Sequence, residues 1–330
     1  MVARITRLLL LFQLLIAFAA SVAAARVFDI DNTLLAALTG IGFVVLFRLL
    51  ITCNNFFLAW RYRSAIPAHH RISAWQAATL FFGEFRATMT ASSWTMPFRL
   101  FSRRGAARPE GLPVLLIHGY GCNSGYWHPL SKALQKANII HHAVDLEPVI
   151  GGIDDYVPMI DAAVERLCRE TGYDKIVIVA HSMGGLATRA YLRARGPARL
   201  AKAITLGTPH HGTALAHFGV GLNTHQMRWT ATEQEGIASD WLRELKAGED
   251  PALYRLFVSI YSHHDNIISP QISSHLEGAR NIELNAVGHV ALGFDPTVQA
   301  LVIREIRAAS AARMDTPTPA TAGAKASLIS

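Results

Sequence analysis

The sequence predicts an α/β fold with a mostly parallel sheet flanked by helices, preceded by two hydrophobic N-terminal helices. Two observations predict the domain. Beyond residue 112, short apolar runs alternate with polar segments of helical period, as a parallel sheet covered by helices requires. One of these runs ends in a small-residue turn at Ser182 that leads directly into a helical segment. A third observation, two long apolar runs before residue 61, predicts the helices in front of it.

The composition fits a protein that meets lipid. Of its 330 residues, 51% are apolar and only 17% are charged, whereas a soluble protein carries about a quarter of charged residues. Cys53, Cys122 and Cys168 lie far apart and form no CxxC pair. We therefore expect no disulfide framework and no metal site.

The first apolar run, residues 8–25, carries no charge and follows Arg4 and Arg7. As a helix it would extend about 27 Å, nearly the thickness of a bilayer core. The same residues also fit a signal peptide, because small residues precede Arg26 in the spacing of a cleavage site.

The second run, residues 33–60, is interrupted by Arg48. If residues 34–53 span a bilayer, Arg48 lies near one end and can extend toward the headgroups. An amphipathic or core helix is the alternative reading. We predict residues 1–60 as a membrane anchor with both flanks in the cytoplasm, since Arg61, Arg63 and Arg71 follow the second run. If that run does not cross, the following domain is outside.

Residues 61–111 are predicted as a basic juxtamembrane segment and linker. Between residues 61 and 108, eight arginines face a single acidic residue, Glu84, so this stretch accounts for the net charge of +7 of the whole chain. Its place directly after apolar runs favours anionic headgroups over nucleic acid. Residues 72–89 fit an amphipathic helix that lies on a membrane, or equally one that packs on the following domain.

The predicted domain covers residues 112–309, and the Ala-, Thr- and Pro-rich residues 310–330 are predicted to be a disordered tail. Strands are expected at 114–117, 140–144, 175–180, 201–206, 256–261 and 281–285. Helices are expected at 127–136, 155–170, 183–195, 239–247 and 297–309.

The turn at Ser182 carries the clearest chemical signal. An apolar strand at 176–180 runs into His-Ser-Met-Gly-Gly and then a helix, the arrangement that exposes a nucleophilic serine. Ala180 stands where a glycine is usual, a tolerable change. Upstream, a strand ends in His118-Gly-Tyr-Gly, a turn that can direct a backbone N–H into the same pocket. Tyr120 and Met183 are therefore the candidate oxyanion donors.

A serine nucleophile needs an acid and a histidine as partners. In folds with such a strand–serine turn–helix arrangement, the acid and then the histidine follow the serine along the chain. Asp265 follows the strand at 256–261, and His289 follows the strand at 281–285. We predict Ser182, Asp265 and His289 as a catalytic triad in which the aspartate orients the imidazole. The alternatives, ranked lower because they lack so clear a strand-then-loop setting, are His263, His264, His275 and Asp295.

These residues resemble bacterial triacylglycerol lipases and related esterases of the α/β-hydrolase superfamily. The resemblance covers residues 112–306, and its segments are HGYGCNSGYW, AHSMGG, LGTPHHGT, SDWLRELK, YSHHDNIISP and VGHVAL. It implies the α/β-hydrolase fold, hydrolysis of carboxylic esters through an acyl-enzyme on Ser182, the same triad and oxyanion residues, and no cofactor for the chemistry. With the predicted anchor it implies a bacterial inner membrane protein with a lipid or acyl-ester substrate.

Two features depart from the secreted members of that family. The hydrophobic pair and the basic linker have no counterpart in them, which argues against a role in extracellular fat digestion. Residues 212–250 form a long segment with several aromatic residues, which fits a lid over an acyl pocket or plain core. An acyltransferase that uses the same triad, or a non-catalytic binding module, are the alternative functions.

Overall fold

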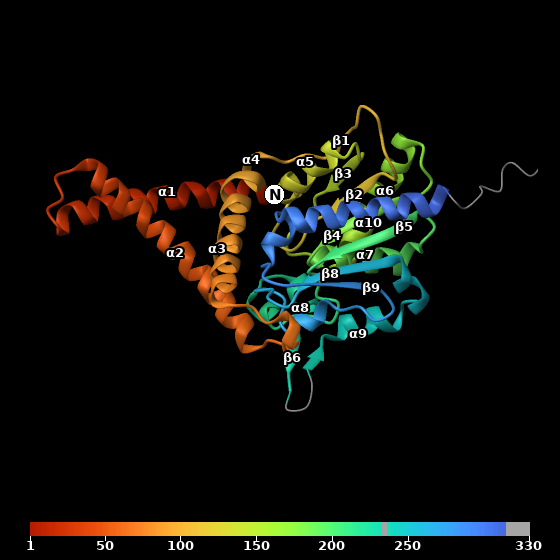
Figure 1. Cartoon of the computed structure of the whole chain (residues 1–330). Coiled ribbons are helices and arrows are strands. Elements are labelled where there is room, and N and C mark those ends of the chain that lie inside the picture. The colour runs from red at the N-terminus through yellow and green to blue at the C-terminus, as the bar shows by residue number, and fades with distance from the viewer. Residues whose placement is uncertain (233–235, 315–330) are drawn as a thin grey trace, which may run out of the picture.

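The computed structural model describes residues 1–232 and 236–314. Its centre is a seven-stranded sheet in the order β1-β3-β2-β4-β5-β8-β9, in which every neighbouring pair from β3 to β9 is parallel and only β1 is antiparallel (Figure 1). The strands are β1 Arg103–Arg104, β2 Val114–Ile117, β3 His141–Val144, β4 Ile176–His181, β5 Leu200–Leu206, β8 Phe257–Ser262 and β9 Arg280–Leu284. The predicted parallel sheet is confirmed. The edge strand β1 was not predicted and lies inside the expected linker.

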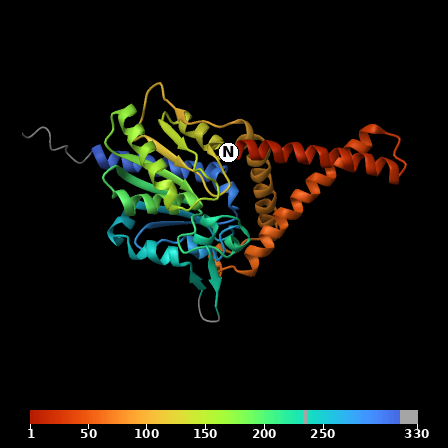
Figure 2. The same cartoon turned by 180° about the vertical axis from the view of Figure 1, so that it is seen from behind.

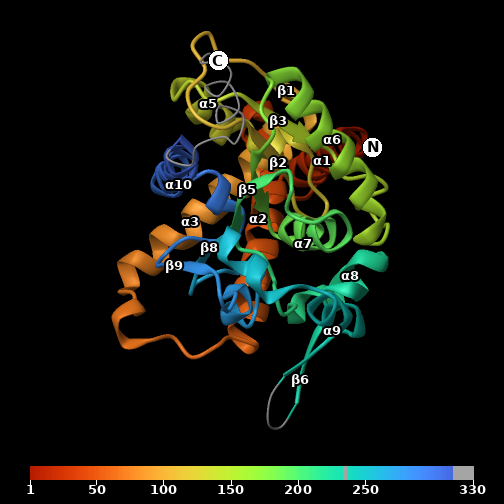
Figure 3. The same ribbon diagram turned by 90° about the vertical axis from the view of Figure 1, so that its right-hand side faces the viewer.

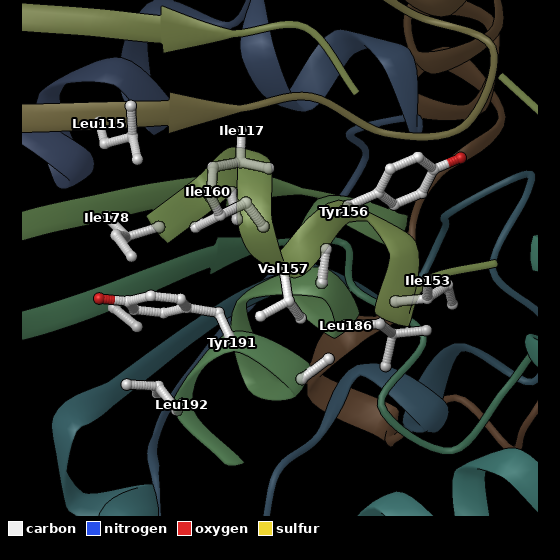
Figure 4. Close-up of a cluster of buried hydrophobic side chains, with 14 of the residues drawn as sticks. Leu115, Ile117, Ile153, Tyr156, Val157, Ile160, Ile178, Leu186, Tyr191 and Leu192 are labelled. Atoms are coloured by element: carbon white, nitrogen blue, oxygen red, sulfur yellow. The ribbon is translucent and has the colours of Figure 1, made fainter. Parts of the chain in front are cut away.

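Helices cover both faces of this sheet, because neighbouring residues of a strand point to opposite faces. Leu115 and Ile117 pack with α6 Val157–Thr171 and α7 Met183–Arg195 (Figure 4). Val114 and Leu116 pack with α5 His128–Lys136 and α10 Pro296–Met314 on the other face. Each such buried side chain stabilises the fold by about 1.5 to 3 kcal/mol relative to exposure.

One predicted boundary is wrong. The last helix does not end at residue 309 but continues to Met314, so the predicted tail begins inside α10. Ser310 is buried and its Oγ accepts a hydrogen bond of 2.8 Å from the backbone N–H of Leu112, which ties the helix to the start of the domain. The rest of the predicted tail, residues 315–330, lies outside the described residues.

The segment between β5 and β8 contains short elements. They are α8 Leu222–Gln226, β6 Trp229–Ala231, β7 Gly236–Ala238 and α9 Asp240–Ala247. β6 and β7 form an antiparallel pair that projects from the domain (Figure 3). Only α9 was predicted within this segment.

The two hydrophobic helices, α1 Val2–Val27 and α2 Thr33–Arg61, form a hairpin whose two ends both return to the α/β domain (Figures 1 and 2). They pack closely at Gly40, where a Cβ would lie 2.1 Å from the carbonyl oxygen of Ala17. Both helices are long and apolar enough to cross a membrane, and most of their large apolar side chains are exposed.

The guanidinium of Arg48 on α2 forms hydrogen bonds with other side chains of the protein. Its Nε donates to Gln13 Oε1 at 2.8 Å, and its Nη1 donates to the hydroxyls of Ser92 and Ser93 at 3.0 and 2.9 Å. If residues 34–53 span a bilayer, the sequence allows this side chain to extend toward headgroups. Instead, polar partners on α1 and on the segment after α3 satisfy it inside the protein.

The predicted amphipathic helix is α3 Ala74–Thr90, which begins at a capping box of Ser73 and Gln76. It packs on the α/β domain, with Glu84 only 1% exposed, while Trp75 and Phe82 face outward. A π-helical turn, Ala91–Thr95, and α4 Met96–Phe98 continue it. The second of the two readings of this segment, a helix packed on the domain, therefore describes the structure.

Candidate active site

Ser182 lies at the sharp turn between β4 and α7 with φ +54° and ψ −127°. A non-glycine residue in such a conformation costs on the order of 1 to 3 kcal/mol and is typical of functional sites. The turn is possible only with small neighbours. A Cβ on Gly184 would lie 2.5 Å from the carbonyl oxygen of Ile117, and one on Gly185 would lie 2.1 Å from Thr208 Oγ1.

Asp265 and His289 are in contact. His289 Nδ1 lies 2.7 Å from Asp265 Oδ2, and Asp265 Oδ1 accepts hydrogen bonds from the backbone N–H groups of Ile267 and Ile268 at 2.8 and 2.7 Å. Both side chains are nearly inaccessible to solvent. The aspartate therefore holds the His289 tautomer with Nδ1–H, which leaves Nε2 free to accept a proton.

Gly207 lies where the three predicted triad residues converge. The N–H of Ser182 donates at 2.9 Å to the carbonyl of Leu206, the residue that precedes Gly207. A Cβ at Gly207, whose φ is +53°, would lie 3.1 Å from Asp265 Oδ2 and 3.2 Å from His289 Nδ1. The end of β5 thus brings the serine turn and the acid–base pair to the same edge of the sheet.

The charge state of His289 depends on opposing effects. Burial disfavours the imidazolium, but the charge and hydrogen bond of Asp265, together with the charge of Glu84, outweigh it and raise the pKa of His289. The lower-ranked candidates are engaged elsewhere. His263 binds Glu283, and the Nδ1 of His264 lies 3.4 Å from the N–H of Ala286. The ring of His275 packs edge-on against that of Tyr261, and Asp295 accepts two backbone N–H groups at the start of α10.

The predicted oxyanion residues flank Ser182. Met183 is the first residue of α7, where a backbone N–H has no partner within the helix. The turn that carries Tyr120 approaches so closely that a Cβ on Gly119 would lie 2.8 Å from Ser182 Cβ. The buried His118 ring fixes this turn, since its Nδ1 lies 2.9 Å from the Gly119 carbonyl and its Nε2 accepts from the N–H of Leu146. Burial lowers the pKa of His118, in keeping with this neutral tautomer.

Two residues that the sequence did not single out hold the His289 loop. The Nε2 of His181 lies 3.0 Å from the His289 carbonyl, and burial holds the pKa of His181 well below its usual range, so a neutral ring donates this bond. Glu84 of α3 accepts from the N–H groups of Val290 and Ala291 at 3.0 and 2.9 Å. The one signal that could have found Glu84 is its isolation as the only acidic residue among the arginines of residues 61–108.

Ser182 opens into a cavity of about 570 Å³ with mostly apolar walls. Part of this wall comes from residues of the segment predicted as a lid, and another part comes from α2. The lining includes Tyr120, Leu215, Phe218, Met227, Ile267 and Ile268, together with Asn54, Asn55 and Leu58 of α2. A larger cavity of about 770 Å³ between Arg189, Trp229 and Tyr254 does not reach Ser182.

His69, His70 and Glu283 are the described residues whose side-chain donors come closest to a metal-ligand set, with one atom of each within 4.8 Å of the others. Glu283 Oε2, however, lies 2.9 Å from His70 Nε2 and 2.7 Å from His263 Nε2. These are hydrogen-bond distances, shorter than the separation of about 3.3 Å between ligand atoms around a tetrahedral zinc ion. Glu283 of β9 thus joins His70 and His263 in a hydrogen-bond network, and the ring of His69 packs against that of His70.

Part of the chain is similar in sequence to curated lipases. A triacylglycerol lipase from Pseudarthrobacter phenanthrenivorans is 30% identical over 114 residues, which cover 32% of this chain and 35% of the lipase. A triacylglycerol lipase from Burkholderia plantarii is also 30% identical over 114 residues, covering 32% of each. The chain thus matches about a third of the length of these curated relatives.

Solved structures show the fold. A mature lipase from Bacillus licheniformis superposes with a TM-score of 0.55 at 15% identity, covering 62% of this chain and 97% of that protein. Lipase B from Aspergillus fumigatus gives a TM-score of 0.50 at 18% identity, covering 61% and 55%. The model of the alpha/beta hydrolase family matches residues 114–318, which is more than half of the chain. The chain therefore belongs to the alpha/beta hydrolase family.

Proposed function

We propose that this protein is a serine hydrolase that cleaves carboxylic esters of lipids through an acyl-enzyme on Ser182. His289 Nε2 takes the hydroxyl proton as Oγ attacks the ester carbonyl, and the N–H groups of Met183 and Tyr120 stabilise the oxyanion. The alcohol leaves with the proton from His289. Water, activated by the same imidazole, then releases the carboxylic acid. The contact between His289 and Asp265 supports the acid–base role.

The cavity at Ser182 is the observation that supports a lipid substrate. Its walls are largely apolar and include Leu58 of α2. The apolar residues Phe218, Val220 and Leu222, in the segment that lines the cavity, are more than half exposed, a surface that suits an acyl chain rather than water. The names of the curated relatives, triacylglycerol lipases, support the same substrate class.

We further propose that the α1–α2 hairpin spans the inner membrane with the catalytic domain on the cytoplasmic side. Because both ends of the hairpin return to the same domain, two crossings place residue 1 and the domain on one side. The arginines after α2 favour the cytoplasmic side. An ester within the membrane could then reach Ser182 along α2.

The test uses the full chain in detergent. A fluorophosphonate probe, which reacts with activated serines, should label the wild type and a Ser102→Ala control on the exposed surface, and should not label Ser182→Ala. p-Nitrophenyl esters of short and long acyl chains should be hydrolysed by the same two labelled proteins, with the long chain preferred. Folded wild-type protein that takes up no probe would contradict the proposed nucleophile.

A further inference from the structure

We propose that Glu84, carried by α3, is a positioning residue of this active site that holds the His289 loop and favours the protonated imidazole during catalysis. This inference rests on the proposed function. It adds a group from outside the matched family region, which begins at residue 114. Ser182, Asp265 and His289 all lie within that region.

The contacts of Glu84 fix the backbone directly after His289. Its two carboxylate oxygens accept separately, Oε1 from the N–H of Val290 and Oε2 from that of Ala291. Residue 288 must be glycine for this approach, because a Cβ there would lie 2.5 Å from Glu84 Oε2. The carboxylate thus binds the first turn after His289, where helical N–H groups lack partners.

The charge of Glu84 acts on the same imidazole. The groups that face His289 are Asp265 from the loop after β8, His181 from the end of β4, and Glu84 from α3. Because His181 is neutral, the charges that act on the His289 imidazole are those of the Asp265 and Glu84 carboxylates. Burial raises the pKa of Glu84 overall, although its two backbone hydrogen bonds and the charge of His289 lower it. Because both of its oxygens accept from N–H groups, the hydrogen-bond geometry favours the ionised form. A carboxylate beside an imidazole that becomes charged in the transition state stabilises that state.

Burying a carboxylate costs several kcal/mol unless it is paired. Glu84 is 1% exposed, and none of the arginines and lysines in residues 1–232 and 236–314 forms an ion pair with it. Its hydrogen-bonding partners are the backbone of the catalytic loop. A buried carboxylate whose partners are two backbone N–H groups and the nearby His289 imidazole is expected where it serves the site.

The orientation of α3 explains how an N-terminal helix supplies this group. Leu80, Glu84 and Ala87 follow the spacing of one helical face and are all buried. Trp75 and Phe82 lie about opposite on the helix and are 77% and 62% exposed. The same helix therefore presents a carboxylate to His289 and aromatic side chains to its surroundings.

The experiment compares Glu84→Gln, Glu84→Asp and a matched control, Glu305→Gln. Glu305 is also buried, but it pairs with Arg280 and Arg304 away from the triad. Activity requires neutral His289, so kcat/KM falls as the pH drops through the His289 pKa. Loss of the Glu84 charge should move this acid limb to lower pH by about one unit and reduce kcat about tenfold. Glu84→Asp should keep the acid limb near its original pH while kcat falls, because the shorter side chain cannot reach both N–H groups.

A second measurement follows the protonation of the His289 ring in the absence of turnover. In protein with labelled histidines, the NMR titration of the His289 ring, assigned with a His289→Gln variant, should show a lower pKa in Glu84→Gln than in the wild type and in Glu305→Gln. An unchanged His289 pKa in folded Glu84→Gln would overturn the inference even if the protein hydrolyses esters. A shifted pKa in a protein that no fluorophosphonate labels would support the role of Glu84 and refute the proposed function.

Discussion

Ser182, Asp265 and His289 each follow a strand of the central sheet, whereas Leu58 and Glu84 reach the same region from helices that precede the sheet. The first group is positioned by the common edge where parallel strands end. The second depends on how α2 and α3 dock on the domain. One site therefore combines groups positioned by local strand-and-turn patterns with groups positioned only by tertiary packing. Four substitutions test these two kinds of positioning.

The largest effect is expected for Asp265→Asn among the strand-end residues. An amide cannot hold the required His289 tautomer as the carboxylate does, so kcat should fall by about 10⁴-fold with little change in KM. Steady-state kinetics on a p-nitrophenyl ester would measure it. A loss of less than tenfold in folded protein would show that Asp265 does not orient the base.

Gly119→Ala tests the turn that carries Tyr120. The added methyl would lie 2.8 Å from Ser182 Cβ, so the serine or the turn must move. A displacement of about 1 Å at a reacting group can lower the rate about 10²-fold. We expect slower fluorophosphonate labelling by that factor. Gly121→Ala, where no atom lies within 4 Å of the added Cβ but φ is +67°, separates backbone strain from this contact.

Leu58→Trp tests whether α2 contributes to the substrate site. A larger side chain in the cavity wall should exclude long acyl chains while it leaves the triad intact. The ratio of kcat/KM for long over short esters should drop by about tenfold, in the range of discrimination by an apolar pocket. Leu46→Trp, at an exposed position of the same helix, is the control. Equal ratios in all three proteins would remove α2 from the substrate site.

Ser269→Ala should have the smallest effect. The Ser269 hydroxyl donates to the carbonyl of Ala59 at 2.8 Å, a direct tie between the domain and the end of α2. Its loss should cost about 1 kcal/mol and lower Tm by about 2 to 4 °C. Thermal unfolding in detergent would measure the change. A Tm equal to that of the wild type would show that this contact adds nothing to docking.

The strands and most helices of the domain were predictable because burial imposes a clear local pattern on them. Residues 114–117 and 183–195 match β2 and α7 at both ends. The order of strand, turn and polar residue was also enough to choose Asp265 and His289, which the structure brings into contact. The strand β1 escaped prediction because two arginines at a sheet edge carry no apolar signal.

The contributions of the N-terminal segment were not predictable in the same way. Arg48 looked like a residue near the end of a span, and only the packing of α1 against the turn after α3 shows its partners. Glu84 looked like an isolated acid in a basic run. Neither docking contact leaves a period or a turn signature in the sequence, because each joins residues far apart along the chain.

The wall that α2 lends to the Ser182 cavity has a practical consequence. Removing residues 1–60 to obtain a detergent-free fragment would delete Asn54, Asn55 and Leu58 together with the hydrophobic hairpin. The remaining serine would sit in an opening of different shape. Substrate profiles measured on such a truncated fragment would describe that altered opening, so screening campaigns need the intact chain in detergent or nanodiscs.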